Sequence, residues 1–121
     1  MVVDTNIVIA CLRAEPGPVA ALSEWKEKGR ALLVSSITLA ELLSYREINE
    51  KESLVIKGFL KNFVSVPFDD NLAEVAAGFR RSYNLEIPDA AIAATAFAYK
   101  LLLVTRDKQF ARIKELTVFA I

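Results

Sequence analysis

The stretch Leu101-Leu102-Leu103-Val104-Thr105-Arg106-Asp107 is an apolar run that ends abruptly in a hydroxyl residue, a cation and an acid. Such a run is typical of a strand buried on both faces of a parallel sheet. Another run, Met1-Val2-Val3, is likewise followed by the polar residues Asp4-Thr5-Asn6. Because ligands bind beyond the carboxyl ends of the strands in an open parallel sheet, we expect Asp4 and Asp107 to lie near each other at one edge.

Apolar runs and helical patterns alternate along the rest of the chain. Further strands are predicted at 31–34, 63–66 and 117–121. Helices are predicted from the first strand to the helix-breaking Pro16-Gly17-Pro18, and then at 19–29, 37–48, 49–62, from an Asp69 or Asp70 cap to Tyr83, from Pro88 to Lys100, and at 108–113. Strands that alternate with helices imply a parallel sheet with right-handed crossovers and helices on both faces. We expect residues 1–121 to form a single α/β domain.

The composition excludes several kinds of chemistry. The 121 residues contain no histidine, which removes histidine-based acid–base catalysis, the Ser-His-Asp arrangement and histidine-ligated zinc. The formal net charge is zero, so the total charge does not by itself indicate a nucleic acid or an anionic membrane as a partner. The only cysteine, Cys11, lies in an apolar segment and is expected to be a small core residue in a reducing, cytoplasmic setting.

A membrane segment is not expected. The longest apolar stretch, Ala90 to Tyr99, is alanine-rich and is followed by Lys100. It is shorter than the roughly 20 residues that a membrane-spanning helix needs. We therefore predict a protein of the cytoplasm with no membrane partner.

Four acidic residues stand near predicted strand ends or helix starts: Asp4, Glu41, Asp89 and Asp107. Carboxylates that crowd together repel one another unless a cation or proton compensates their charge, and a hard cation with oxygen ligands is a suitable partner. Each acid also has a simpler interpretation. Asp4 and Asp107 could cap helices, Glu41 could complete a capping box that begins at Thr38, and Asp89 suits the first turn of a helix.

Several segments in combination resemble PIN-domain proteins of the VapC toxin type. They are Asp4-Thr5-Asn6, Ser36 to Leu42, Ile87-Pro88-Asp89 with the alanine-rich segment Ala90 to Ala96, and Leu103 to Asp107. The resemblance covers essentially the whole chain. It implies a three-layer α/β/α sandwich with a central, mainly parallel sheet, the activity of a metal-dependent endoribonuclease that hydrolyses RNA, and a role as the toxin of a toxin–antitoxin pair.

The resemblance also implies roles for individual residues. Asp4, Glu41, Asp89 and Asp107 would be the catalytic acids, with Asp4 and Asp89 as direct ligands of Mg²⁺ or Mn²⁺. Glu41 and Asp107 would act through water or position a second ion, because Mg²⁺ usually takes only one or two protein carboxylates. Thr5, Asn6 and Thr105 would orient the carboxylates. The implied partners are RNA, a cognate antitoxin and a second copy of the chain in a homodimer.

Basic residues must surround an acidic site if it is to hold RNA. The candidates are Arg80, Arg81, Arg106, Lys108 and Arg112, although each alone is more simply read as solvated surface. The apolar fraction of 54% exceeds what a small domain needs for its core, so part of it is expected in a dimer face or a groove for the antitoxin. Trp25, Tyr45 and Phe59 are possible anchors there, with core packing as the simpler reading of each.

Other classes of protein share some of these features. A receiver-type signalling domain and a phosphotransferase of the haloacid-dehalogenase type also place acids at strand ends. The latter normally has a second acid two positions after the first, where this chain has Asn6, and in a receiver the phosphoacceptor would end a middle strand, for which Asp69 is poorly placed behind Pro67-Phe68. A third alternative is a non-catalytic binding module whose acids only cap helices.

Overall fold

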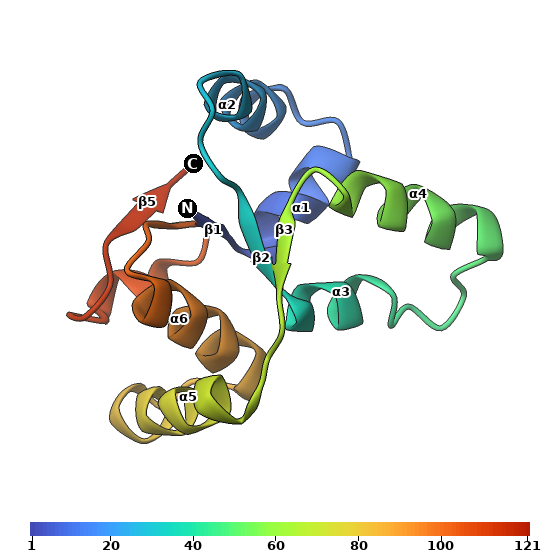
Figure 1. The fold of residues 1–121 in the computed structure, drawn as a ribbon. Helices are drawn as coiled ribbons and strands as arrows, with labels where there is room; N and C mark the ends of the chain where they lie inside the picture. Colours follow the sequence, from blue (N-terminus) through green and yellow to red (C-terminus); the bar gives the residue numbers. More distant parts are fainter.

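A computed structural model describes residues 1–121, and its centre is a sheet of five parallel strands (Figure 1). The strands are β1 (Val2–Val3), β2 (Leu33–Ser35), β3 (Val64–Val66), β4 (Leu103–Thr105) and β5 (Val118–Ala120). Their order across the sheet is β3-β2-β1-β4-β5, and every neighbouring pair is parallel. All five predicted strands are therefore present, and the sheet is wholly parallel.

Helices cover both faces of this sheet. They are α1 (Thr5–Leu12), α2 (Pro16–Glu27), α3 (Ser36–Leu42), α4 (Glu50–Leu60), α5 (Asp70–Tyr83) and α6 (Ile87–Tyr99), with a short 3-10 helix, η1, at Lys108–Arg112. Figure 1 shows α5 and α6 on one side of the strands and α1 to α4 on the other. This arrangement confirms the predicted three-layer sandwich. None of these helices is long and apolar enough to cross a membrane.

Two apolar cores form because successive side chains of a strand point to opposite faces of the sheet. In β1, Val2 packs in the core beneath α5 and α6, whereas Val3 packs in the core beneath α1, α2 and α4. Leu103 and Val104 of β4 divide in the same way. Burial on both faces explains why the strands read as continuous apolar runs in the sequence.

Two helix boundaries differ from the prediction. Pro16-Gly17-Pro18 does not end the first helix, which stops at Leu12; instead Pro16 is the first residue of α2, where its missing amide hydrogen costs nothing. The helix predicted over 37–48 ends at Leu42, and 43–49 form a loop. In that loop the Ser44 hydroxyl donates to the Ala40 carbonyl, and Asn49 accepts from the Glu52 amide to cap α4. The local hydrogen bonds therefore override the helical spacing of the apolar residues.

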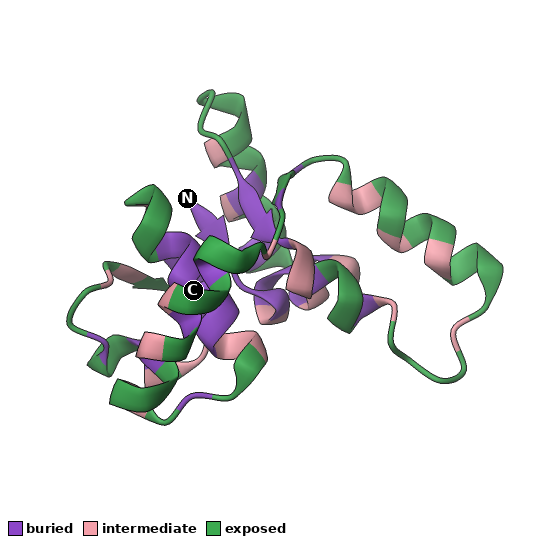
Figure 2. Ribbon diagram, turned by 60° about the horizontal axis from the view of Figure 1, so that its bottom comes forward, coloured by how far each residue is buried: buried purple, intermediate pink, exposed green.

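The helices α6 and α4 differ sharply in their burial (Figure 2). Seven consecutive residues of α6, Ala90 to Ala96, are buried, because five of them are alanines and let the helix approach the sheet closely. By contrast, no residue of α4 is buried, and Leu54 and Val55 are 62% and 58% exposed. The 43–49 loop and α4 therefore project from the body of the molecule (Figure 1), and we call this segment the α4 arm.

Candidate functional site

The first acid of the site lies at the carboxyl end of the central strand β1. Val3 of β1 pairs with Val104 of β4, so Asp4 and Thr105 meet across the two strands. The Thr105 hydroxyl donates to Asp4 Oδ2 at 2.6 Å. Asp4 stands at the N-cap position of α1, yet its side chain accepts no capping hydrogen bond. The capping interpretation of Asp4 is therefore wrong, and its carboxylate faces β4 instead.

A chain of hydroxyl groups connects Asp4's neighbour to Glu41. The Thr5 hydroxyl donates to Glu41 Oε1 at 2.8 Å and lies 2.9 Å from the Thr38 hydroxyl. The helix cap of α3 is Ser35, whose side chain accepts from the Ile37 amide, so the capping box from Thr38 to Glu41 is also wrong. Thr38 itself was not among the predicted site residues. Its position three residues before Glu41, on the same helix face, was the signal that could have identified it.

Asp89 and Asp107 are joined by a residue that the sequence did not single out. The Gln109 side-chain amide donates to Asp89 Oδ2 at 3.0 Å and to Asp107 Oδ2 at 2.6 Å. Asp107 also caps η1, since its Oδ1 accepts from the Gln109 backbone amide at 3.0 Å. The capping interpretation of Asp107 is confirmed, but the residue contacts the site as well. A search for acidic residues passes over a neutral amide, which is why Gln109 was missed.

The predicted supporting residues lie beside these acids. The Asn6 amide group approaches the Thr105 hydroxyl at 3.5 Å, and the Asn6 carbonyl accepts from the Arg106 backbone amide at 3.4 Å. Thr105 accepts from the Asp107 amide at 2.9 Å while it donates to Asp4. Thr105 therefore connects Asp4 and Asp107, which confirms that these two acids lie at the same edge.

The carboxylates of the site influence one another's ionisation. Burial raises the pKa of Asp4 from 3.8 to about 6; the hydrogen bond from Thr105 opposes this rise, and the charges of Asp89 and Asp107 add to it. The pKa of Asp89 is also raised, first by burial and then by Asp107 and Glu41, against a lowering hydrogen bond from Gln109. All four predicted acids thus take part in one electrostatic cluster.

The site suits a hydrated hard cation better than a closed metal cage. No group of three or more acidic or cysteine side chains is close enough to form a ready-made cage. However, Mg²⁺ keeps several waters and usually binds only one or two carboxylates. Asp4 is 4% exposed, and both this burial and the charges of Asp89 and Asp107 disfavour the ionised form of its carboxyl group. A bound cation would therefore stabilise the ionised carboxylate. The residues present therefore fit a divalent cation, with Asp4 and Asp89 as candidate ligands.

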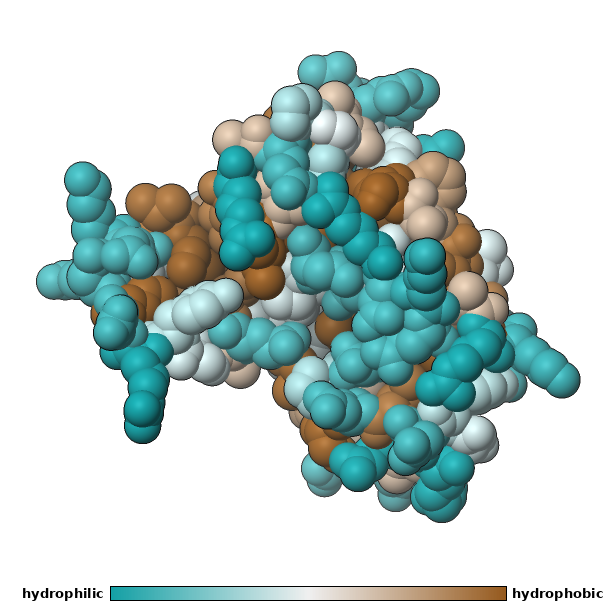
Figure 3. Space-filling model, turned by 180° about the vertical axis from the view of Figure 1, so that it is seen from behind, coloured by the Kyte–Doolittle hydropathy of each residue, from teal (hydrophilic) through white to brown (hydrophobic).

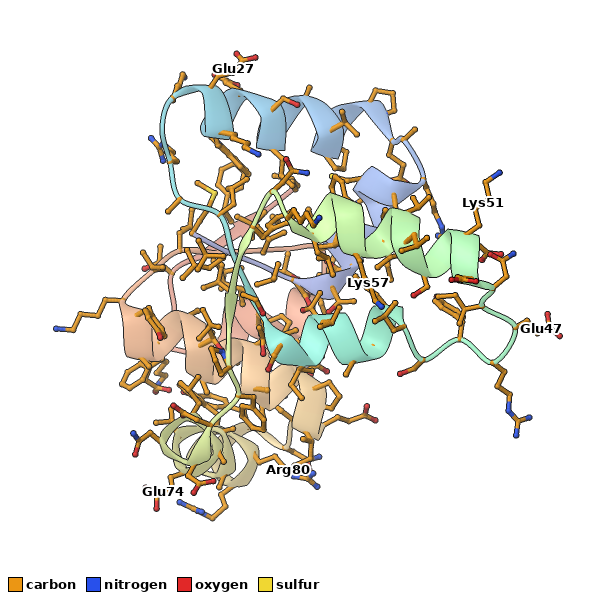
Figure 4. All side chains as sticks on the ribbon, turned by 45° about the vertical axis from the view of Figure 1, so that its right-hand side comes forward. Glu27, Glu47, Lys51, Lys57, Glu74 and Arg80 are labelled. Atoms are coloured by element: carbon orange, nitrogen blue, oxygen red, sulfur yellow. The ribbon has the colours of Figure 1, made fainter.

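The predicted basic residues fall into two groups. Arg106 forms an ion pair with Glu15 at 2.6 Å and donates to the Ile121 carbonyl, while Arg112 donates to the Tyr83 carbonyl and lies over the Tyr83 ring. These two arginines are engaged in tertiary contacts. The other three, Arg80, Arg81 and Lys108, are exposed and form no ion pair. Figure 4 shows Arg80 on α5, on the other side of the sheet from Lys51 on α4.

An apolar groove lies beside the α4 arm. It has a volume of about 720 Å³, and its lining includes Ile9, Leu12, Tyr45, Val55 and Ile56. Seen from behind, apolar atoms gather between the arm and the body of the molecule (Figure 3). Of the three predicted aromatic anchors, Tyr45 is 60% exposed at this groove. Trp25 packs edge-on against Phe119, and Phe59 packs edge-on against Phe63.

Comparison with known proteins gives a consistent result. The family model of the PIN domain matches residues 1–116. No protein with a curated function matches the sequence. Among solved structures, a toxin–antitoxin complex from Klebsiella pneumoniae has a chain that is 28% identical, with a TM-score of 0.81 and coverage of 99% of this chain and 98% of that one.

Two further structures agree. FitAcB from Neisseria gonorrhoeae is 28% identical, with a TM-score of 0.75 and coverage of 98% of this chain and 95% of that one. DNA-bound VapBC from Salmonella typhimurium is 24% identical, with a TM-score of 0.84 and coverage of 98% and 96%, and it supports the fold alone. The match to the PIN-domain model argues against the receiver-type and dehalogenase-type alternatives. With its acids gathered at the edge of a parallel sheet, the chain belongs to the PIN-domain family.

Proposed function

We propose that the chain is a metal-dependent endoribonuclease that hydrolyses RNA phosphodiester bonds and is the toxin of a VapBC-type pair. The observation that carries this proposal is the cluster of four carboxylates, contributed by four separate elements, in a protein of the PIN-domain family. Repulsion among these carboxylates raises the free energy of the site when no cation is bound. It therefore favours binding of a divalent cation.

Each acid has a distinct place in the proposed site. Asp4 and Asp89 would hold Mg²⁺ or Mn²⁺ directly, and Glu41 and Asp107 would act through water. When bound, such an ion lowers the pKa of its water and offsets charge on the phosphate oxygens. Thr105 holds Asp4 and Thr5 holds Glu41 through short hydrogen bonds, which fix the carboxylates before substrate arrives. The Asn6 side-chain amide donates a long hydrogen bond to the Thr105 hydroxyl, at 3.5 Å.

We expect the RNA backbone to be held by exposed basic residues outside the acidic cluster. Arg80 and Arg81 line a depression of about 590 Å³ that also includes Phe68 and Ile87, and Ile87 is two residues before Asp89. Lys108 follows Asp107 directly and is exposed. We expect these three cations to contact phosphates, and RNA affinity therefore to fall as salt concentration rises. Arg106 and Arg112 contribute less, because their charges are already engaged within the fold.

The antitoxin is proposed to cover the groove beside α4. The toxin–antitoxin complex from Klebsiella pneumoniae, with a chain 28% identical to this one, supports such a partner. In this chain the groove combines apolar side chains, including Tyr45 and Val55, with charged groups at its rim such as Arg13 and Glu52. An amphipathic segment matches that combination. We further propose, on the family resemblance alone, that the protein forms a homodimer in the cytoplasm.

The proposed activity is tested with purified protein, freed of any co-purifying partner, and labelled RNA. We expect cleavage in Mg²⁺ or Mn²⁺ and none in chelator. Asp4→Asn and Asp89→Asn should each abolish it, and Asn71→Asp, an exposed change on α5, serves as the control. Cleavage that persists in chelator, or in both site variants, would contradict the proposal.

A further inference from the structure

Gln109 occupies the space between two of the acids. Its side-chain nitrogen is a hydrogen-bond donor to one carboxylate oxygen of Asp89 and to one of Asp107, at 3.0 and 2.6 Å. The amide orientation is fixed by its surroundings. If the amide were reversed, its carbonyl oxygen would face two carboxylates and repel both, since an amide oxygen only accepts hydrogen bonds.

Asp107 is bound by Gln109 through both of its oxygens. Oδ2 accepts from the Gln109 side chain, and Oδ1 accepts from the Gln109 backbone amide at 3.0 Å. Asp89 is bound only through Oδ2, and its other oxygen accepts no side-chain hydrogen bond. Asp4 makes no contact with Gln109; its side-chain partner is Thr105. Gln109 therefore engages the Asp89–Asp107 side of the cluster and leaves the Asp4 side open.

A donor group between two carboxylates takes the position that a second cation would need. The hydrogens of the amide carry partial positive charge and already offset part of the repulsion between Asp89 and Asp107. A cation placed there would meet those hydrogens and would have to displace hydrogen bonds to charged acceptors, which are about twice as strong as neutral ones. An ion that Asp4 and Asp89 would hold on the other side of the cluster would not need to displace either bond.

We propose that Gln109 restricts this site to a single divalent cation by occupying the second-ion position between Asp89 and Asp107. The inference rests on the proposed metal-dependent function, and it deepens that function by assigning the number of ions. Gln109 acts as a positioning residue, since it holds Asp107 out of direct coordination. Asp107 then acts on the ion through water.

The experiment measures how many Mn²⁺ ions the full chain binds, by calorimetry and by electron paramagnetic resonance of free Mn²⁺. The wild type should bind one ion. Gln109→Ala, which empties the position without adding charge, should bind a second ion, with an affinity on the order of tenfold or more above the limit that the wild type sets, because the hydrogen bonds from Gln109 to the two carboxylates are gone. Gln109→Glu should bind the second ion more tightly still. Asn71→Asp adds the same charge on exposed α5 and should bind one ion.

The outcomes separate this inference from the proposed function. Two ions on the wild type, or a single ion on both Gln109 variants, would overturn the inference while leaving metal-dependent cleavage intact. A second ion with Gln109→Glu but not with Gln109→Ala would also overturn it, since the added carboxylate rather than the vacated position would then create the site. If the wild type binds no Mn²⁺ at all, both the inference and the proposed function fail. Should Gln109→Ala not fold, Gln109→Ser provides the same vacancy.

Discussion

The helices α6 and α4 have similar lengths, 13 and 11 residues, but opposite relations to the sheet. Seven consecutive residues of α6 are buried, and Asp89 stands in its first turn. No residue of α4 is fully buried: Ile56, Phe59 and Leu60 pack only partly against the core, and Leu54 and Val55 stay exposed. Packing against the sheet therefore fixes α6 firmly within this chain, whereas α4 is held more loosely and keeps apolar side chains at the surface.

This contrast separates two tasks of the protein. The proposed chemistry depends on Asp89, which a rigid helix holds beside Asp4 and Asp107. The proposed recognition of the antitoxin depends on α4, where an exposed apolar surface is available. Changes in α6 should thus affect folding and catalysis, and changes in α4 should affect partner binding. The following predictions test that separation, from the largest effect to the smallest.

The largest effect is expected at Asp89. Asp89→Asn keeps the size of the side chain and its contact with Gln109 but removes the charge. The rate of RNA cleavage should fall on the order of a thousandfold, because a metal ion contributes several kcal/mol of transition-state stabilisation and this variant would lose it. Glu50→Gln in the first turn of α4 removes the same charge from the other helix and should leave the rate unchanged. Single-turnover cleavage of labelled RNA measures both. A comparable loss in the two variants would remove the contrast between the helices.

A second effect concerns the buried charge of Asp4. The folded-state pKa of about 6 lies above the ordinary value of 3.8, so the folded protein binds more protons between these values and its stability falls as pH rises through that window. In chelator, Asp4→Asn should therefore stabilise the protein near pH 8, by roughly 3 kcal/mol at most, and by little near pH 4. Urea unfolding at the two pH values measures this. A stability gain of equal size at both would contradict the assignment.

A third effect tests the packing of α6. Ala94 is fully buried, so Ala94→Leu should overpack the core and destabilise the fold by about 2 kcal/mol. Val55→Leu also enlarges a helical side chain, but Val55 is 58% exposed on α4, so a change within about 0.5 kcal/mol is expected. Chemical denaturation of both variants measures the difference. Equal destabilisation would mean that α4 is packed as firmly as α6.

The smallest change in stability is expected at Val55→Asn, which places a polar group in the groove. Unfolding free energy should stay within about 0.5 kcal/mol, because the site is exposed. Affinity for the proposed antitoxin should fall about tenfold, the loss expected when an interface residue that contributes substantially to binding is changed. Titration with the proposed cognate antitoxin measures binding. Unchanged affinity would place the antitoxin elsewhere on the surface.

The sheet could be predicted because burial on both faces gives each strand an uninterrupted apolar run, as in Leu101 to Val104. The parallel direction of the strands could be predicted because strands and helices alternate along the chain. The loop at 43–49 could not be predicted from spacing, since Leu42, Tyr45 and Ile48 recur every three residues although the helix ends at Leu42. Leu42 is buried, whereas Tyr45 lies exposed at the groove, so the spacing does not mark one continuous helix.

The four acids could be proposed from their places at strand ends and helix starts. What the sequence did not reveal was how they are held. The link from Thr5 to Thr38 and Glu41 spans more than 30 positions, and Gln109 bridges acids from two separate elements. Such contacts depend on side-chain direction across elements, which local patterns do not encode.

The unburied state of α4 also determines how this part of the chain moves. Helix segments with few buried contacts open locally without unfolding the whole domain, and their backbone amides then exchange hydrogen with solvent quickly. In the free protein, amides of Glu50 to Leu60 should exchange far faster than those of Ala90 to Ala96. When a partner covers the groove, only the first group gains protection. Exchange at α4 would then report directly what fraction of the protein is bound to the proposed antitoxin.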